Sequence, residues 1–212
     1  MFTLKRKHLQ GNAKRNDMFP YSVIPVNSLQ YKNHFRETWL QTWLEEGYAQ
    51  TDSIVEKYAK YDSFSDDFLL TKQEQPIGTL RIVKQNDVVG LPVLDDFSID
   101  NSFNITEELC EATLLTVKKS ERQSDYVPSL LLLIQLWQYV RQKNIPGIVI
   151  AADVRLWFLL RRKLELSFHK IGQEKIYEGS ITVPGYLNVR EQKERAMKSP
   201  LKNILWQALR EI

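Results

Sequence analysis

A single cysteine, Cys110, stands among the 212 residues of the chain. One thiol excludes an internal disulfide framework and indicates a reducing compartment. Only three histidines accompany it, so we expect no metal site. No stretch reaches the roughly 18 uncharged apolar residues that a membrane span requires, and the first residues lack the apolar core of a secretory signal. We therefore expect a cytoplasmic protein without a membrane span.

Signatures of several enzyme classes are also missing. The chain has neither a G-x-S-x-G elbow nor a phosphate-binding P-loop, so hydrolase and NTPase activities lack support. Hydrophobic residues make up 43% of the chain and charged residues 26%, which are ordinary values for a globular domain.

The net charge of +3 is concentrated at the N-terminus. Residues 1–20 hold five basic residues and one acidic residue, which leaves 24 basic and 25 acidic residues for the rest of the chain. We interpret residues 1–20 as a basic, flexible arm and residues 21–212 as a single domain. A solvated arm is the simpler interpretation, and contact with nucleic acid or anionic lipid is the alternative.

Hydrophobic periodicity predicts a mixed order of strands and helices. Helices are expected over residues 29–47, 53–60, 127–143, 154–166 and 191–210, and strands over residues 21–26, 67–72, 77–83, 108–118, 148–152, 168–177 and 180–189. Residues 88–100 are expected to form a loop, and residues 73–76 a hairpin turn. The strand, helix and strand between residues 108 and 152 form a parallel unit, whereas hairpins on either side make the sheet mixed. The fold class is therefore α/β (α+β under another labelling), with a mixed central sheet flanked by helices.

Several short motifs occur in a defined order along this pattern. They are Arg36, Tyr61-Asp62, Gly78-Thr79-Leu80-Arg81-Ile82-Val83, Leu91-Pro92 with Phe97, Glu111, Phe168-His169-Lys170-Ile171-Gly172 and Pro184. Their order and spacing over residues 21–190 resemble the GNAT (GCN5-related N-acyltransferase) superfamily. Within it, the chain is similar to the N-acyl amino acid synthases and to the autoinducer synthases that make acyl-homoserine lactones.

The chain departs from the family pattern in two places. The family usually has an arginine three residues after the strand glutamate, and this chain has Leu114 there. General acetyltransferases have a Gln/Arg-x-x-Gly-x-Gly/Ala loop whose backbone N–H groups hold the coenzyme A pyrophosphate, but residues 121–128 contain no glycine. The resemblance therefore favours acyl carrier protein over coenzyme A as the source of the acyl group. The same absence would also suit a non-catalytic relative.

The resemblance implies a candidate site around two neighbouring strands. Arg81 and Glu111 are expected to face each other. The pair would position the acceptor, or Arg81 would keep Glu111 ionised as the base that acyl transfer requires. A structural ion pair is the alternative. Asp62, Arg36 and Phe97 are expected on the acceptor side. There Arg36 would pair with Asp62, unless Asp62 only caps a turn and Arg36 only meets solvent or a neighbouring residue.

Two tyrosines are candidates for the acid that protonates the departing thiolate. Tyr126 precedes the long helix and is the first choice, and Tyr139 lies further along the same helix. Packing is the alternative role for both, since aromatic side chains usually belong to the core. Cys110 is expected to be a buried strand thiol.

Two basic clusters are candidate contacts for the donor. Lys118, Lys119 and Arg122 precede the long helix, and Arg155 and Arg162 are expected to share one face of the next helix. They would steer an acidic carrier protein to the site; a solvated helix face is the alternative. The apolar runs 130–134 and 156–160 are expected to line an acyl channel or to belong to the core.

Together these features predict an N-acyltransferase that moves a medium or long acyl chain. The donor would be an acyl carrier protein or coenzyme A thioester lying in a notch between splayed central strands. The acceptor would be the amine of an amino acid or similar small molecule, with no permanently bound cofactor. The alternatives are an acyl-homoserine-lactone synthase, which also uses S-adenosylmethionine, and a non-catalytic GNAT-like domain. Nucleic-acid binding would rest on the basic arm alone.

Overall fold

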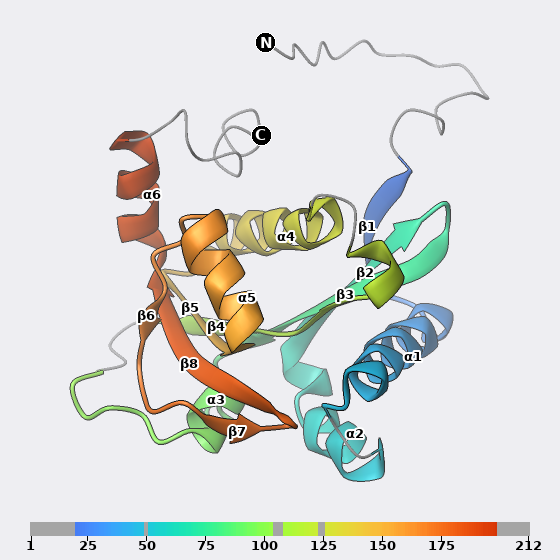
Figure 1. Ribbon diagram of the computed structural model, residues 1–212, viewed down its shortest axis with the longest axis horizontal. Coiled ribbons are helices and arrows are strands. Elements are labelled where there is room, and N and C mark those ends of the chain that lie inside the picture. Colours follow the sequence, from blue (N-terminus) through green and yellow to red (C-terminus); the bar gives the residue numbers. More distant parts are fainter. Residues whose placement is uncertain (1–19, 49–50, 104–107, 123–125, 199–212) are drawn as a thin grey trace.

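A mixed sheet runs through the centre of the computed structural model, which describes residues 20–48, 51–103, 108–122 and 126–198 (Figure 1). The eight strands are β1 (Tyr21–Pro25), β2 (Ser65–Lys72), β3 (Gln75–Lys84), β4 (Leu109–Val117), β5 (Gly147–Asp153), β6 (His169–Lys170), β7 (Lys175–Tyr177) and β8 (Ser180–Asn188). Their order is β1-β2-β3-β4-β5-β8-β6, and β7 also pairs with β8. Only β4 and β5 are parallel among these pairs, which confirms the predicted parallel unit in a mixed sheet.

Helices cover both faces of this sheet (Figure 1). They are α1 (Leu29–Glu46), α2 (Thr51–Ala59), η1 (Asp62–Phe64), α3 (Pro92–Asp96), η2 (Lys119–Glu121), α4 (Val127–Lys143), α5 (Val154–Phe158), the π-helical turn η3 (Leu159–Lys163) and α6 (Val189–Lys198). The core beneath α4 and α5 contains the buried Leu132, Leu136 and Leu160, and the core beneath α1, α2 and α3 contains Phe35, Ile54 and Val93. None of the helices in the described part of the chain is both long and apolar enough to cross a bilayer.

The ends of α1 follow from its sequence. The Ser28 side chain accepts a hydrogen bond from the Tyr31 N–H at 3.2 Å, which satisfies one of the free donors of the first turn. Gly47 has a φ of +73° and ends the helix in the left-handed region, where glycine carries no steric cost. These ends, and the bounds of α4, confirm the predicted helices.

The hairpin between β2 and β3 turns earlier than expected. Gln73 and Glu74 form its two-residue turn, with φ values of +49° and +66°, whereas Pro76 already belongs to β3. Pro76 pairs with Thr71 beside a shift in register. A proline lacks the N–H of a regular ladder, so it occupies the irregular position of the strand rather than the turn.

Three further expectations from the sequence need correction. Part of the expected loop 88–100 is helix α3, which begins with a proline at its first position, where no N–H is needed. The expected strand 168–177 is divided into β6 and β7, because Gly172 between them bridges to Ile99. The expected helix 154–166 changes into the π-helical turn η3 at Leu159. The expected helix 191–210 is α6, and its part beyond Lys198 lies outside the described residues.

A notch opens between the two central strands. β4 and β5 pair only over Leu109–Glu111 and Gly147–Val149. Beyond this point Leu114 has a φ of +47°, and the register between β3 and β4 shifts; together they mark a bulge that turns β4 away from β5. β5 continues beside β8 along its whole length. The strands therefore diverge, as the resemblance to the GNAT superfamily implies.

Candidate functional site

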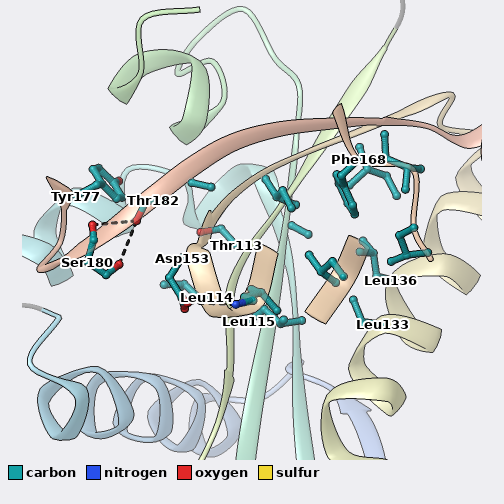
Figure 2. Close-up of a pocket in the computed structure, with 18 of the residues that line it drawn as sticks. Thr113, Leu114, Leu115, Leu133, Leu136, Asp153, Phe168, Tyr177, Ser180 and Thr182 are labelled. Carbon is teal, nitrogen blue, oxygen red and sulfur yellow. Dashed lines mark hydrogen bonds between the residues drawn. The ribbon is translucent and has the colours of Figure 1, made fainter. Parts of the chain in front are cut away.

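A cavity of about 130 Å³ occupies the notch between β4 and β5. Its two ends differ in chemistry, as Figure 2 shows: Leu133, Leu136 and Phe168 lie at one end, and Tyr177, Ser180 and Thr182 lie at the other. The apolar end is completed by side chains of α4, η3 and β8, among them Trp137, Leu160 and Leu187. The cavity can therefore hold a molecule that is apolar at one end and polar at the other.

The polar end is built around Tyr177. Its hydroxyl donates a hydrogen bond to Asp96 Oδ2 at 2.5 Å and accepts one from Lys57 Nζ at 2.8 Å. Lys57 also forms ion pairs with Asp96 and Glu178, each at 3.0 Å. Tyr58 and Thr113 line the cavity together with Tyr177. The residues of this cluster come from α2, α3 and β7 and the turn after it, so no short motif in the sequence predicted it.

Glu111 lies outside the lining of this cavity, although the adjacent Ala112 belongs to it. The side chain is 1% exposed, and Oε2 accepts a hydrogen bond from the Val93 N–H at 2.7 Å. Burial raises the pKa of Glu111 well above its usual range, the Val93 N–H opposes this, and the nearby Asp96 and Asp95 reinforce it. In this arrangement the carboxyl group caps the first turn of α3.

The expected Arg81–Glu111 pair is wrong. Arg81 is 6% exposed and forms two 2.8 Å contacts with the Asp67 carboxylate and one with Asp62. It also donates to the Tyr58 carbonyl oxygen at 2.9 Å. Asp67 stands directly opposite Arg81 on β2, so the partner of Arg81 comes from the neighbour on the other side of β3. Arg81 therefore belongs to an ion pair with Asp67 and Asp62, and Glu111 is not its partner.

The residues expected on the acceptor side do not form one group. Arg36 is exposed on α1, and the expected Arg36–Asp62 pair is wrong because Asp62 binds Arg81. Phe97 is 4% exposed, and its ring centroid lies 5.1 Å from that of Tyr177. Phe97 therefore positions Tyr177 from the side, which gives it an indirect connection to the cavity.

The two candidate acids lie in different surroundings. Tyr126 is 54% exposed and has a φ of +60° just before α4. Tyr139 is buried and donates to Asp66 at 2.7 Å, outside the lining of the notch cavity. Cys110 is fully buried on β4, which confirms the expected buried strand thiol, and burial raises the pKa of this thiol to about 12.

A second, larger cavity of about 620 Å³ lies beside the notch, and Tyr126 is one of its lining residues. It shares Trp43, Tyr48, Leu115, Asp153 and Leu156 with the first cavity. Two of the basic residues predicted to contact a donor also line it, Arg122 and Arg155. We call this second cavity the basic cleft.

Glu46, at the end of α1, joins the two arginines of the basic cleft. Its carboxylate lies 2.7 Å from Arg122 Nη1 and 3.2 Å from Arg155 Nη2. Desolvation raises the pKa of Glu46, but Arg122 and Arg155 outweigh it, so the pKa lies below its usual value. Asp153 Oδ1 lies 3.7 Å from Arg155 Nε, so the two arginines face two carboxylates, and Lys163 supplies the excess positive charge of the cleft lining.

The other predicted donor contacts lie outside the cleft lining. Lys118 is half-buried and Lys119 is exposed, and neither lines the cleft. Lys163 lines the cleft together with Arg155, and Arg162 does not. The π-helical turn η3 takes more residues per turn than an α-helix, and this moves the shared face one residue along the chain.

Within the described residues, no group of three His, Cys, Asp or Glu side chains is arranged to hold a metal ion. The basic cleft offers three cations, Arg122, Arg155 and Lys163, to an anionic group. The chemistry that the two cavities can support is therefore binding of an anionic, apolar-tailed molecule beside a cluster of hydroxyl and carboxylate groups.

Comparisons with known proteins agree with this architecture. No protein-family model and no curated protein sequence matches the chain. Among solved structures, an N-acyl amino acid synthase (FeeM) from uncultured soil microbes is 16% identical, with a TM-score of 0.65 over 88% of this chain and 97% of that chain. The acyl-homoserine-lactone synthase LasI is 14% identical, with a TM-score of 0.56 over 79% and 88%. A GNAT-family acetyltransferase from Staphylococcus aureus Mu50 is 14% identical, with a TM-score of 0.52 over 80% and 99%. The chain therefore has the GNAT fold.

Proposed function

We propose that the chain is an N-acyltransferase whose reaction takes place in the notch between β4 and β5. The observation that carries the proposal is the two-ended cavity at the point where the parallel strands diverge. Its apolar end suits a medium or long acyl chain, and its polar end suits an amine acceptor. The likeness to the fold of several acyltransferases supports this assignment without specifying the substrate.

The basic cleft supports an acyl carrier protein as the donor. The phosphopantetheine arm of a carrier has a single phosphate, at the end that is joined to the protein. This matches a site where Arg122, Arg155 and Lys163 are offset by Glu46 and Asp153. The start of α4 is less suited to a pyrophosphate, because Pro128 removes one N–H from the first turn and residues 121–128 contain no glycine. The shared wall at Tyr48 and Leu115 would let the arm pass from the cleft into the notch.

The reaction would use the backbone of β4 as well as its side chains. The amine nitrogen attacks the thioester carbonyl carbon, and the oxygen becomes an oxyanion. Beyond Glu111 the edge of β4 no longer pairs with β5, so its N–H groups are the donors available to the oxyanion. The C–S bond then breaks, and Tyr126, on the wall of the basic cleft, would protonate the thiolate.

Mass spectrometry of the products tests the proposal. We expect N-acylated amino acids, or related fatty amides, to accumulate in the lipid extract of a bacterial host that expresses the protein. The purified protein should form the same products from acyl carrier protein thioesters and an amine. A Leu136→Trp variant, which fills the apolar end, should shift the products to shorter acyl chains.

The other outcomes separate the alternatives. Acyl-homoserine lactones would identify an autoinducer synthase, and N-acetyl products would identify an acetyl-coenzyme A enzyme. No new acylated product, together with no thermal shift on addition of acyl carrier protein or acyl-coenzyme A, would identify a non-catalytic domain and contradict the proposal.

A further inference from the structure

One glutamine lies among the apolar side chains of the notch cavity. Gln192 is on α6, is 1% exposed and belongs to the cavity lining. It supplies the one side-chain amide among the described residues of this lining. Its hydrogen-bond partner Ser167 stands between Leu166 and Phe168, which both line the cavity. Because Phe168 lies at the apolar end (Figure 2), Gln192 belongs to this end and not to the end with Tyr177.

The amide group of Gln192 is oriented by Ser167. Its Oε1 accepts a hydrogen bond from the Ser167 N–H at 2.7 Å and another from the Ser167 hydroxyl at 2.8 Å. A backbone N–H can only donate, so the amide atom that it contacts must be the oxygen. These two contacts therefore fix the other atom of the amide as Nε2, which carries two N–H donors.

Nε2 is the group that this arrangement leaves unsatisfied. It is buried and has no hydrogen-bond partner within the described part of the chain. A buried N–H without an acceptor costs free energy, so such a donor in a cavity wall indicates a ligand that supplies the acceptor. A buried water needs two or more polar partners, whereas Leu160, Leu166 and Leu187 line this end. An oxygen atom carried by an apolar chain needs only the one donor.

We propose that Gln192 selects acyl chains with a keto or hydroxyl oxygen in the half of the chain far from the thioester, and that Nε2 donates a hydrogen bond to this oxygen. The inference rests on the proposed function, because it requires the acyl chain to occupy the apolar end of the notch. It narrows the donor from any medium or long acyl chain to an oxygenated one. Gln192 is then a residue that determines specificity and takes no part in bond breaking.

The expected selectivity follows from what a plain chain leaves behind. A plain chain fills the apolar end but gives Nε2 no acceptor, and a site built to bind a polar substrate group discriminates against the analogue that lacks it. A keto oxygen only accepts, which matches an amide nitrogen that only donates. A hydroxyl group also accepts, but its own proton then needs a partner. We therefore expect the order of preference to be keto, hydroxyl and plain.

Decanoyl thioesters of acyl carrier protein test this selectivity. The keto group is placed at successive carbon atoms of the chain, the plain decanoyl thioester is the reference, and mixed amino acids are the acceptors. Mass spectrometry of the competing products gives the ratio of kcat/KM values. Chains with the keto group in the far half should exceed the plain chain by about tenfold or more. A keto group beside the thioester should give no such gain.

Two variants connect the preference to Nε2. Gln192→Met keeps the length of the side chain and removes the amide, so the preference for the keto chain should fall to within about twofold. Ser167→Ala is the matched control, because it removes the hydroxyl contact with Oε1 but keeps the Ser167 N–H and Nε2. It should keep the wild-type preference. A general disturbance of the contact between the two residues would lower the preference in both variants.

A binding measurement covers the case in which Gln192→Met does not fold, since this variant also takes the acceptor from the buried Ser167 N–H. Titration calorimetry of the wild-type protein with N-decanoylglycine and its keto analogues requires no turnover. The keto group should tighten binding by about tenfold at the same positions that raise kcat/KM. Equal affinities for the plain and keto ligands would contradict the inference.

Three kinetic results would also overturn the selection by Gln192. They are equal kcat/KM values for plain and keto chains in the wild type, a preference that is greatest beside the thioester, and a preference that survives in Gln192→Met. Each of them leaves the proposed function intact, because acyl transfer still takes place. A wild-type protein that transfers neither plain nor oxygenated chains from acyl carrier protein or coenzyme A overturns the proposed function itself.

Discussion

Four neighbouring residues hold the guanidinium group of Arg81. Asp67 and Asp62 bind it through carboxylates, and the Tyr58 carbonyl oxygen accepts its remaining contact. The Phe35 ring lies 5.5 Å from its central carbon. A substrate carboxylate would have to displace these partners, so Arg81 contributes to the fold.

Arg81→Met is expected to destabilise the protein by about 3–5 kcal/mol, because it leaves the Asp67 carboxylate without its partner in a largely buried position. Urea unfolding measures the loss. Arg36→Met removes an exposed arginine and is the control, with a change within about 0.5 kcal/mol. An Arg81→Met protein that unfolds like wild type but loses turnover would show that Arg81 acts in the reaction and not in the stability of the fold.

Glu46 predicts a pH dependence of stability. Its pKa is lowered in the folded protein relative to a usual value of 4.5. A lowered folded pKa stabilises the protein above the unfolded value, and the contribution disappears as the pH falls through the folded pKa. We expect wild type to exceed Glu46→Gln in stability at pH 6–7, and the difference to shrink below about pH 4.5. Urea midpoints across this range measure it; a difference that grows on acidification would contradict the assignment.

At the scale of the element, the turn between β2 and β3 is strained. Gln73 and Glu74 both have positive φ, which costs a residue with a side chain about 1 kcal/mol or more. Gln73→Asn with Glu74→Gly gives the sequence that this type of turn favours. We expect the double variant to be more stable by about 1 kcal/mol in urea unfolding, with turnover unchanged. A less stable double variant would show that the wild-type side chains support the hairpin.

From the lining of the basic cleft we predict which basic residues contact the donor. Arg155→Gln should raise the KM for acyl carrier protein by about tenfold, which corresponds to the loss of one charge-assisted hydrogen bond. Arg162→Gln is the control, because Arg162 is exposed and lies outside the cleft lining. Steady-state kinetics at low and high salt measure both effects. Equal changes in the two variants would indicate general charge attraction instead of a defined cleft.

Regular elements could be predicted from the sequence because their signals are local. Ser28 and Gly47 mark the ends of α1, and the apolar run before Lys143 marks α4. The partner of Arg81 could not be predicted, because the sequence does not show that Asp67 stands opposite it on β2. The π-helical turn η3 was missed for a similar reason. Its effect on Arg162 and Lys163 depends on hydrogen bonds that periodicity does not reveal.

The polar cluster of the notch could not be predicted from the sequence, because its residues are far apart along the chain. Lys57 and Tyr177 are 120 residues apart, and Asp96 and Tyr177 are 81 residues apart. None of them belongs to a short motif. The notch itself was predicted from the resemblance to the GNAT superfamily, whereas the groups that face it follow from how α2, α3 and β7 pack together.

At the scale of the whole molecule, the described core begins at the N-terminal end of β1. The Pro20 carbonyl oxygen accepts a hydrogen bond from the Gln73 N–H at 2.9 Å. Residues 1–19, which hold five basic residues and one acidic residue, lie outside the described residues. The predicted division into an arm and a single domain therefore stays a prediction.

Deletion of residues 1–19 tests this division. We expect the stability of the remaining chain to change by no more than about 0.5 kcal/mol and acyl transfer to continue, because Pro20 and β1 are retained. Thermal unfolding and turnover measure the two effects. Salt-sensitive retention of the full-length protein alone on nucleic acid would show instead that the arm binds it.

The short junction between β4 and β5 sets the order in which the molecule can be completed during synthesis. Strands β1 to β4 form one half of the sheet, and all of them precede residue 118. The second half joins it along three pairs of residues and is formed by β5 to β8. The walls of the notch cavity come from residues as far apart as Trp43 and Gln192. A growing chain can therefore fold its first half-sheet on the ribosome, but it acquires the cavity only after α6 has emerged.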